Sequence, residues 1–325
     1  MKDVVTSKFR LRELDVLRGL AALTVVLFHY TTRYNELYGH AKDTVLFFSN
    51  GFAGVFLFFM ISGFVIFWSA SRSSSGSDFV VSRVTKLYPV YWCCLLLTFG
   101  FVSWFSLPGR EITILEAFAN AMMFHGAFGI PNIDNVYWTL LVELTFYFWV
   151  FCALYIGRRE KLNVYLSVVL CMATIYLFLD PSLFWVKALQ KIFILKYAAL
   201  FISGICFYRW WTNGVDRADI LLILWSMAII SVSQMIPNFV LFFYLVFYLM
   251  ISGNLRFLVI TPLIFFGTIS YPLYLIHQNI GYIVIRASYE NGFNSYVGIF
   301  MALTISIVLA VMLTFYMEKP MIRFL

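Results

Sequence analysis

Long apolar runs, separated by short polar or basic segments, make up almost the whole chain. Each run approaches the roughly 20 residues that an α-helix needs to cross the hydrocarbon core of a bilayer. The pattern therefore predicts an all-α protein, a polytopic membrane helical bundle of about ten transmembrane helices. The predicted spans are residues 14–33, 51–70, 88–107, 136–156, 162–180, 193–211, 218–234, 238–252, 264–286 and 296–317.

Basic residues between the spans indicate how the helices are oriented. With the N-terminus placed inside, fifteen Lys and Arg residues fall in inner segments and seven in outer ones, while Arg18 lies within its span. Cytoplasmic loops carry an excess of Lys and Arg. Both termini are therefore expected in the cytoplasm, with residues 1–12 as a cytoplasmic N-terminal segment.

Composition supports the same class of protein. The chain is 62% hydrophobic and 12% charged, with a mean hydropathy of +0.87, whereas a soluble domain is about 45–50% apolar and about 25% charged. We expect one integral membrane domain over residues 1–325, with membrane lipids around it. The net charge is +7, but the basic residues punctuate apolar runs, so no nucleic-acid partner is expected. The five cysteines lack metal-ligand spacing, so no metal site is expected.

Two ionisable residues lie within the first span. Arg18 and His29 are eleven residues apart, which is about 20° more than three helical turns, so both side chains share one helix face roughly 16 Å apart. Ionisable residues inside a membrane indicate a functional site. Two simpler explanations stay open: Arg18 extends to the headgroups or pairs with Asp15, and His29 is an interfacial histidine without a task.

Two more cations precede the third span. Arg83 and Lys86 are one helical turn apart and project together. Beside Arg18 they would form a basic pocket at the inner mouth, suited to phosphate groups. The alternative is that they are ordinary basic residues flanking a membrane helix.

The fourth span carries a carboxylate near its outer end. Glu143 lies about two turns below the outer surface, at the depth expected for His29. Pairing with Glu143 would fix the tautomer of the imidazole and raise its basicity. The alternative is a protonated Glu143 in an unrelated interhelical hydrogen bond.

The later spans add further polar residues. Pro272 is expected to kink the ninth span where it lines a cavity. His277 falls in the outer half of that span, and by itself favours a packing role. Glu318 is expected to pair locally at the inner end. Residues 112–124 of the longest outer connection have helix-like apolar spacing, typical of an interfacial or re-entrant segment.

Five segments, in this order, resemble the membrane acyltransferase-3 family. The quoted residues are LDVLRGLAAL with Arg18 and His29, Phe58 to Phe64 (FFMISGF), Arg83-x-x-Lys86-Leu-Tyr-Pro, Trp138-Thr139 with Glu143, and Ser270-Tyr271-Pro272 with His277. The resemblance runs from about Arg12 to Pro320 and is to the stand-alone form, without the SGNH-type hydrolase domain of some relatives. One departure is Lys86, where the family often has a second Arg, which loses a bidentate fork for phosphate.

The resemblance implies transfer of an acyl group, most often acetyl, from cytoplasmic acetyl-coenzyme A to a carbohydrate hydroxyl. Arg18, Arg83 and Lys86 would hold the phosphates of the donor. His29, oriented by Glu143, would act as general base or accept the acyl group first. The remaining motif residues, which would support the substrate or the structure, are Trp138, Tyr271 and His277.

The expected partners follow from this reaction. They are acetyl-coenzyme A as donor, with no permanently bound cofactor, and a carbohydrate or lipid-linked oligosaccharide as acceptor. The acceptor would belong to an O-antigen, exopolysaccharide or capsule, and the location would be a bacterial plasma (inner) membrane. The rival hypothesis is a proton-coupled transporter of a sugar or lipid-linked glycan, which would also use intramembrane His and Glu but usually shows repeated halves. A non-catalytic scaffold would leave the buried charges without a reason.

Overall fold

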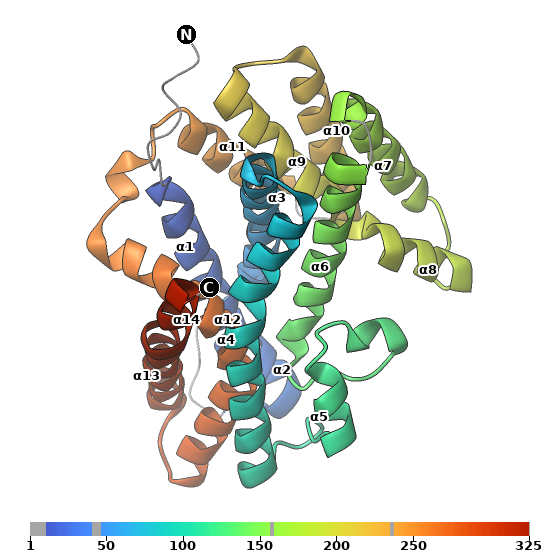
Figure 1. Ribbon diagram of the computed structural model, residues 1–325. Coiled ribbons are helices and arrows are strands. Elements are labelled where there is room, and N and C mark those ends of the chain that lie inside the picture. Colours follow the sequence, from blue (N-terminus) through green and yellow to red (C-terminus); the bar gives the residue numbers. More distant parts are fainter. Residues whose placement is uncertain (1–10, 41–46, 157–158, 235–236, 325) are drawn as a thin grey trace.

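The computed structural model describes residues 11–40, 47–156, 159–234 and 237–324. Within these ranges the regular structure is entirely helical, without a strand. Figure 1 shows the helices gathered side by side in one bundle. The predicted fold class, an all-α polytopic bundle, is confirmed.

Fourteen α-helices occur in the described ranges. They are α1 (Arg12–Phe28), α2 (Tyr34–Tyr38), α3 (Gly54–Arg72), α4 (Gly76–Phe105), α5 (Ile114–Asn120), α6 (Trp138–Phe151), α7 (Leu162–Tyr176), α8 (Phe184–Phe193), α9 (Leu195–Asn213), α10 (Arg217–Gln234), α11 (Pro237–Ile251), α12 (Thr261–Glu290), α13 (Ser295–Leu313) and α14 (Lys319–Phe324).

Eight shorter segments depart from α-helical geometry. Three are π-helical, namely η1 (His29–Arg33), η5 (Cys152–Ile156) and η8 (Thr314–Glu318). Five are 3₁₀ turns, namely η2 (Ser49–Ala53), η3 (His125–Phe128), η4 (Asn135–Tyr137), η6 (Arg159–Lys161) and η7 (Arg256–Leu258). Single π-turns inside helices occur frequently at functional sites, and two of these three include a candidate site residue, His29 or Glu318.

Seven helices among the described residues are long and apolar enough to cross a membrane. They are Arg12–Tyr38, Ser49–Arg72, Gly76–Phe105, Asn135–Ile156, Phe184–Asn213, Arg217–Gln234 and Ser295–Met321. Two more predicted spans correspond to α7 and α11, which have 15 residues each. The remaining predicted span, 264–286, corresponds to α12. The protein is thus an integral membrane protein with at least seven candidate crossings, and the count of ten stays a prediction.

The helix α12 is long but polar at its middle, because protein rather than lipid surrounds it. Residues 272–283 are buried without a break, and α1, α4 and α13 pack against the helix. Polar side chains are tolerated at membrane depth when they face the interior of a bundle. The helix continues through Pro272, and its polar residues are available to build a site.

Glycines bring two pairs of helices into backbone contact. At the crossing of α1 and α12, a methyl group on Gly19 would lie only 2.6 Å from the backbone nitrogen of Gly267. At the crossing of α3 and α9, a methyl group on Gly63 or Gly204 would collide with the backbone of the other helix. Small residues at helix crossings allow this close approach in membranes. Each pair therefore behaves as one packed unit.

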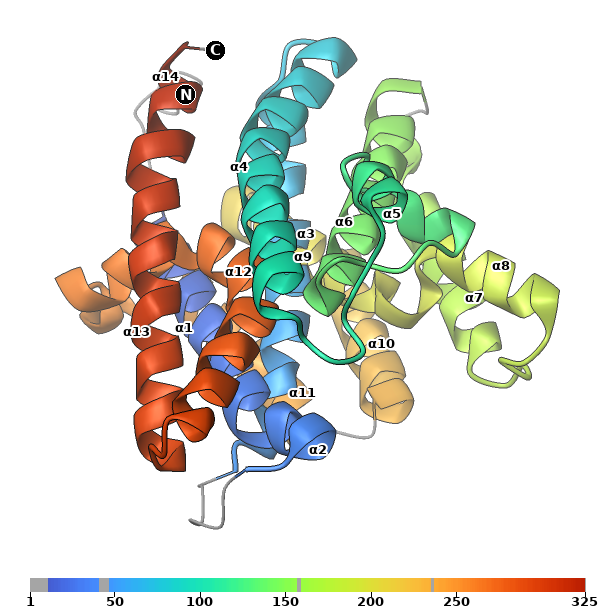
Figure 2. The same ribbon diagram turned by 90° about the horizontal axis from the view of Figure 1, so that it is seen from below.

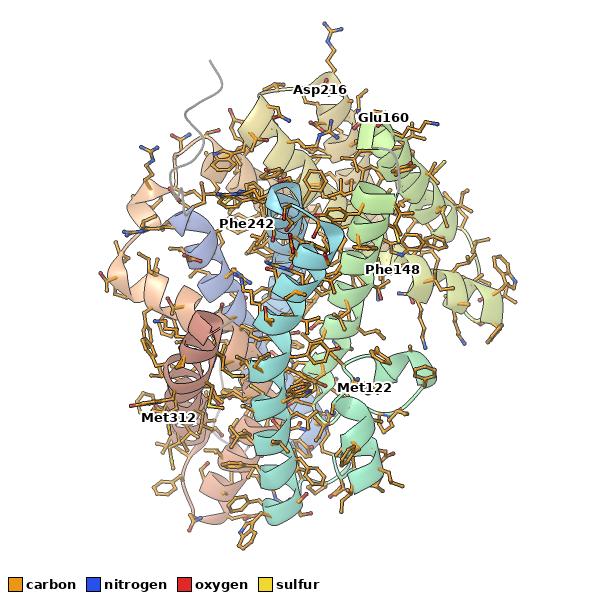
Figure 3. All side chains as sticks on the ribbon, in the orientation of Figure 1. Met122, Phe148, Glu160, Asp216, Phe242 and Met312 are labelled. Carbon is orange, nitrogen blue, oxygen red and sulfur yellow. The ribbon has the colours of Figure 1, made fainter. Side chains whose placement is uncertain are left out.

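Two short helices lie outside the main bundle. Figure 2 shows α5 and α8 on the same side of the molecule as α6 and α7. The predicted interfacial segment 112–124 forms only the seven-residue α5, which a Thr113–Glu116 capping box begins. Its Leu115 and Phe118 side chains are 83% and 78% exposed. The last residues of α8 contact Trp149, near the end of α6, and side chains project outward from both short helices (Figure 3).

Candidate active site

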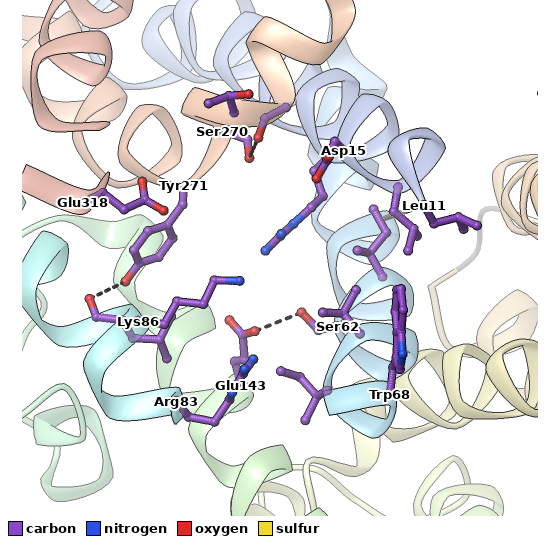
Figure 4. A pocket seen from close by; sticks show the side chains of 18 of the residues that line it. Leu11, Asp15, Ser62, Trp68, Arg83, Lys86, Glu143, Ser270, Tyr271 and Glu318 are labelled. Carbon is purple, nitrogen blue, oxygen red and sulfur yellow. Dashed lines mark hydrogen bonds between the residues drawn. The ribbon is translucent and has the colours of Figure 1, made fainter. Parts of the chain in front are cut away.

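A cavity of about 410 Å³ lies among α1, α3, α4, α6 and α12 (Figure 4). The three predicted donor-binding cations all line it: Arg18 from α1, and Arg83 and Lys86 from α4. Leu11, near the start of the described chain, and Lys319, near its end, line the same cavity. Residues far apart in the sequence are thus brought together around one basic space.

One of these cations carries an unused hydrogen-bond donor. The Nη2 atom of Arg83 donates to the hydroxyl groups of Ser69, at 2.9 Å, and Ser82, at 3.0 Å. Its Nε atom is buried and has no partner among the described residues. A buried unpaired donor is costly, and an anionic oxygen would satisfy it. The guanidinium group therefore fits a phosphate ligand in the cavity.

Glu143 also lines this cavity, and the predicted pairing with His29 is wrong. Its Oε1 atom accepts hydrogen bonds from the hydroxyl groups of Ser62, at 3.0 Å, and Tyr147, at 2.6 Å. Figure 4 shows its carboxylate beside Lys86 and Arg83. The sequence indicated how deep Glu143 lies along α6 but not which helices its face meets. Glu143 therefore belongs to the basic cavity and not to the histidine.

Glu318 is likewise placed differently from the prediction. It was expected to pair locally, but it lines the cavity, and its Oε2 atom is buried without a partner in the described part of the chain. The π-helical segment η8 ends at this residue. Together with Asp15 and Glu143, it places three carboxyl groups beside four cations, because Lys319 lines the cavity as well. An anionic ligand in this cavity would therefore be attracted by the cations and repelled by the carboxylates.

Tyr271 connects the cavity to the rest of the bundle. Its hydroxyl group donates to the carbonyl oxygen of Leu87, at 3.0 Å, directly after Lys86. The bond ties α12 to the segment of α4 that carries two of the cations. Tyr271 also lines the cavity, so it supports the position of Lys86 in the structure.

His29 has a different partner, the imidazole of His277. The Nε2 atom of His277 lies 3.1 Å from the Nδ1 atom of His29, and the ring centroids are 4.9 Å apart. His277 is fully buried, whereas His29 is partly exposed. The phenolic hydroxyl of Tyr30 donates to the backbone carbonyl of His277, at 2.8 Å, which fixes the two helices at this level.

The surrounding acceptors assign the protons on both rings. The Nδ1 atom of His277 faces the carbonyl oxygens of Tyr274, at 2.8 Å, and Leu273, at 3.2 Å, so it carries the proton and leaves Nε2 as an acceptor. The Nδ1 atom of His29 then faces two acceptors, His277 Nε2 and the carbonyl of Val25 at 2.9 Å. The proton of the His29 ring is therefore on Nδ1, and the lone pair on its Nε2 is free. Among the described residues, this Nε2 has no hydrogen-bond partner, as a general base requires.

Along α3 and α12, two aromatic rings lie between the cavity residues and the level of the histidines. Phe58 lies one turn from the cavity residue Ser62 on α3, and Tyr274 lies one turn from Tyr271 on α12. Their ring centroids are 5.4 Å apart, and the ring of Tyr274 also contacts His277 at 5.9 Å. One face of α12 thus leads from the basic cavity at Tyr271 through Tyr274 to His277.

Trp138 lies away from both the basic cavity and the histidine pair. Its ring contacts Phe59 and Tyr197, and it lines a separate cavity beside the first half of α6. The next residue, Thr139, shares a hydrogen bond of 3.1 Å with the hydroxyl group of Tyr274. Trp138 is therefore connected to the histidine pair through two residues, Thr139 and Tyr274.

Sequence reasoning missed two features of the site. These are the contact of His277 with His29 and the position of Glu318 in the wall of the basic cavity. His277 carried a usable signal, because its predicted depth in the ninth span matched the depth of His29 in the first. Glu318 carried no such signal, because a π-turn at its position is invisible in the apolar pattern.

Comparison with known proteins matches a family model. The acyltransferase-3 model, described as an acyltransferase domain, covers residues 11–317. The exopolysaccharide production protein ExoZ of Rhizobium meliloti (strain 1021) is 25% identical over 310 residues, which are 88% of this chain and 94% of that one. No solved structure matches.

Two further relatives match over shorter parts. Nodulation protein 10 of Rhizobium leguminosarum bv. viciae is 31% identical over 168 residues, which are 45% of each chain. The O-acetyl transferase of Shigella phage Sf6 is 34% identical over 91 residues, which are 28% of this chain and 26% of that one. The aligned part is thus less than half of either relative.

Proposed function

The chain belongs to the acyltransferase-3 family, and from this premise we propose that it is a membrane O-acetyltransferase acting on a cell-surface carbohydrate. The proposed donor is cytoplasmic acetyl-coenzyme A, and the acceptor is a hydroxyl group of an O-antigen, exopolysaccharide or capsule unit. The names of two relatives, an exopolysaccharide production protein and an O-acetyl transferase, support this acceptor class and acyl group.

The observation that carries the proposal is the group of three cations around one cavity. Arg18, Arg83 and Lys86 line about 410 Å³ of space, and the buried Nε atom of Arg83 lacks a partner in the described ranges. Phosphate groups suit such a site because guanidinium and ammonium groups form charge-assisted hydrogen bonds with their oxygens. Coenzyme A carries its phosphates at one end and its thioester at the other, so phosphates held in the cavity would leave the thioester free to extend toward His29.

The thioester has to travel outward from the cavity to reach His29. Arg18 and His29 are eleven residues apart on one helix, which corresponds to roughly 16 Å. The extended pantetheine arm of the donor suits this path through the bundle. It would have to displace the ring contact of Phe58 with Tyr274. Donor entry therefore requires a movement of side chains between α3 and α12.

The chemical step uses the free lone pair of His29. Its Nε2 atom takes the proton of the acceptor hydroxyl while the hydroxyl oxygen attacks the thioester carbonyl. The carbon–sulfur bond breaks, and the leaving thiolate takes up the proton from the imidazolium. During the step the other proton stays on His29 Nδ1, which donates it to Val25 O and His277 Nε2. A route through an acylated His29 uses the same atom as nucleophile and stays open as the alternative.

The location follows from the donor. Acetyl-coenzyme A is cytoplasmic, so the basic cavity would open to the cytoplasm, with both termini on that side of a bacterial plasma membrane and the histidine pair toward the outer face. Membrane lipids and the glycan acceptor would be the other partners. Family membership favours this enzyme over the proton-coupled transporter.

Donor binding tests the role of the cavity. Arg83→Ala should raise the Kd for acetyl-coenzyme A about tenfold, because it removes one charge-assisted contact with a phosphate. Lys86→Arg should keep the affinity, because it keeps the charge. Arg72→Ala is the matched control, since Arg72 is exposed and does not line the cavity. An unchanged Kd in Arg83→Ala would remove the phosphate role.

Product formation tests the reaction itself. Purified protein in nanodiscs should transfer a labelled acetyl group to surface glycan, and His29→Ala should abolish transfer but keep the affinity for coenzyme A. Mass spectrometry of the surface glycans of a deletion strain should show the loss of one acetyl modification. Full transfer by His29→Ala would refute the mechanism, and intact acetylation in the deletion strain would refute the function.

A further inference from the structure

A second cavity, of about 580 Å³, lies at the end of α6 that the proposed topology places toward the outer face. Its walls come from the η3 segment, α6, α8 and the start of α9, and Trp138 is part of them. Figure 2 shows α6 and α8 on one side of the molecule, away from α13. The mechanism above does not use this chamber. We call it the outer chamber.

His125 gives the outer chamber an unsatisfied acceptor. The side chain is only 3% exposed, and it lines the chamber. Its Nε2 atom donates to the Oδ1 atom of Asn132, at 2.8 Å, so its Nδ1 atom is the acceptor. This Nδ1 atom is buried without a partner in the described part of the chain. A hydroxyl group of a ligand would satisfy it.

Two cations lie in the wall of the same chamber. Lys191 and Lys196 are both exposed, and neither forms an ion pair with a described residue. Carboxyl groups are missing from the chamber wall as the described residues form it. The chamber is therefore electropositive and suits an anionic group that also carries hydroxyl groups.

An apolar groove adjoins the outer chamber. It has a volume of about 340 Å³ and lies between α6, α7 and α9, with side chains such as Phe146, Val169 and Phe201 in its walls. Ile194, in the turn between α8 and α9, lines both spaces. Along α6, Thr145 faces the chamber and the next residue, Phe146, faces the groove. A chamber that carries two lysines and a histidine thus leads into an apolar groove, as the two ends of an amphiphile require.

We propose that the outer chamber and the groove together bind the acceptor in its lipid-linked form, a glycan joined through phosphate to a polyprenyl chain. The phosphate lies at Lys191 and Lys196, a sugar hydroxyl donates to His125, and the polyprenyl chain fills the groove. This rests on the proposed function, because it names the form in which the acceptor arrives. The route from chamber to histidines is short: Trp138 lines the chamber, Thr139 bonds to Tyr274, and the Tyr274 ring contacts His277.

Photocrosslinking tests the site in the intact protein. The probe is a polyprenyl phosphate with a diazirine in its chain, added to the protein in phosphatidylcholine nanodiscs. Peptide mass spectrometry should find the label on α6, α7 and α9. Unlabelled polyprenyl phosphate should compete, whereas phosphatidylglycerol and polyprenol without phosphate should compete at least tenfold less. Equal competition by phosphatidylglycerol would show a general lipid site and overturn the proposal.

Matched variants separate the two ends of the site. Lys191→Gln with Lys196→Gln should weaken labelling about tenfold, whereas Lys187→Gln, on α8 but outside the chamber wall, should not. Val169→Trp should block the groove, whereas Val164→Trp, on the lipid-exposed side of α7 at 56% exposure, should label normally. Equal labelling in each variant and its control would overturn the proposal.

Acetyl-transfer assays distinguish a failure of the lipid site from a failure of the proposed function. If these variants lost transfer to the lipid-linked acceptor but kept transfer to a water-soluble glycan, both proposals would stand. If polyprenyl phosphate failed to label the groove while acetyl transfer to soluble glycan was normal, only the site would be refuted. If labelling succeeded but no acetyl transfer occurred with any glycan, the proposed function would fail and the lipid site would stand.

Discussion

The orientation of the His29 ring depends on a second imidazole. Because His277 Nδ1 donates to two backbone carbonyls, its Nε2 presents an acceptor to His29 Nδ1 and leaves the Nε2 lone pair of His29 free. His277 does not touch the reacting atoms in this arrangement, so it is a positioning residue. A side chain that cannot accept a hydrogen bond should disturb the rate and leave donor binding intact.

We therefore expect His277→Phe to lower kcat for acetyl transfer by about tenfold to a hundredfold, the usual effect of losing an orienting partner. The Kd for acetyl-coenzyme A should not change. His277→Gln, whose amide oxygen can accept from His29, should recover part of the rate. Combined with His29→Ala, His277→Phe should have no further effect, because residues acting as one unit are non-additive. A full kcat in His277→Phe would contradict this role.

Glu143 is expected to act on donor binding. Its carboxylate lies in the cavity with the three cations, where it repels the donor phosphates. Glu143→Gln keeps an acceptor for Ser62 and Tyr147 but removes the charge. The Kd for coenzyme A should fall several-fold, most clearly at low ionic strength, as measured by calorimetry in nanodiscs. A loss of kcat with unchanged Kd would instead indicate that Glu143 assists His29.

Among the elements, the entry to α6 is fastened to α12 by one buried carboxyl group. Asp134 is fully buried, and it accepts hydrogen bonds from the backbone amides of Asn279, at 3.1 Å, and Val136, at 3.2 Å. The side chain of Asn279 returns a bond to the carbonyl of Ile133, at 2.8 Å. This double connection lies two residues beyond His277 and holds the segment before α6 against the middle of α12.

Burial raises the pKa of Asp134 from 3.8 to about 6. Between these values the folded protein binds the proton more tightly than the unfolded chain does, so this group's contribution to stability falls as pH rises from about 4 to about 6. Asp134→Asn cannot titrate. The difference in Tm between wild type and variant, measured in detergent across this range, should therefore shift in favour of the variant as pH rises. A constant difference would contradict the raised pKa.

How much the sequence predicts differs between elements. Apolar runs located the helices well because a membrane span needs a fixed length of apolar chain. They could not show that α12 is the buried centre, since its polar middle lowers its hydropathy, nor that π-turns begin at His29 and end at Glu318. The depth of Glu143 was readable, but its neighbours depend on which helices pack together, and one sequence does not determine that packing.

For the whole molecule, the positions of the chain ends support a common side for both termini. Leu11 and Lys319 line one cavity, so a reporter fused to either end should report the same compartment, the cytoplasm. A reporter inserted at Gly129, in the loop before α6, should report the opposite compartment and serves as the control. Fusions at the two ends that report different compartments would contradict this topology.

The glycine crossing of α1 with α12 makes the enzyme dependent on the order of its own synthesis. Gly19 and Gly267 are about 250 residues apart, and ribosomes add roughly 5–20 residues per second. The first helix to leave the ribosome thus waits roughly 12 to 50 seconds for its partner. Until α12 arrives, His29 lacks His277. An unfinished chain therefore carries no assembled histidine pair, and catalysis begins only when the protein is almost complete.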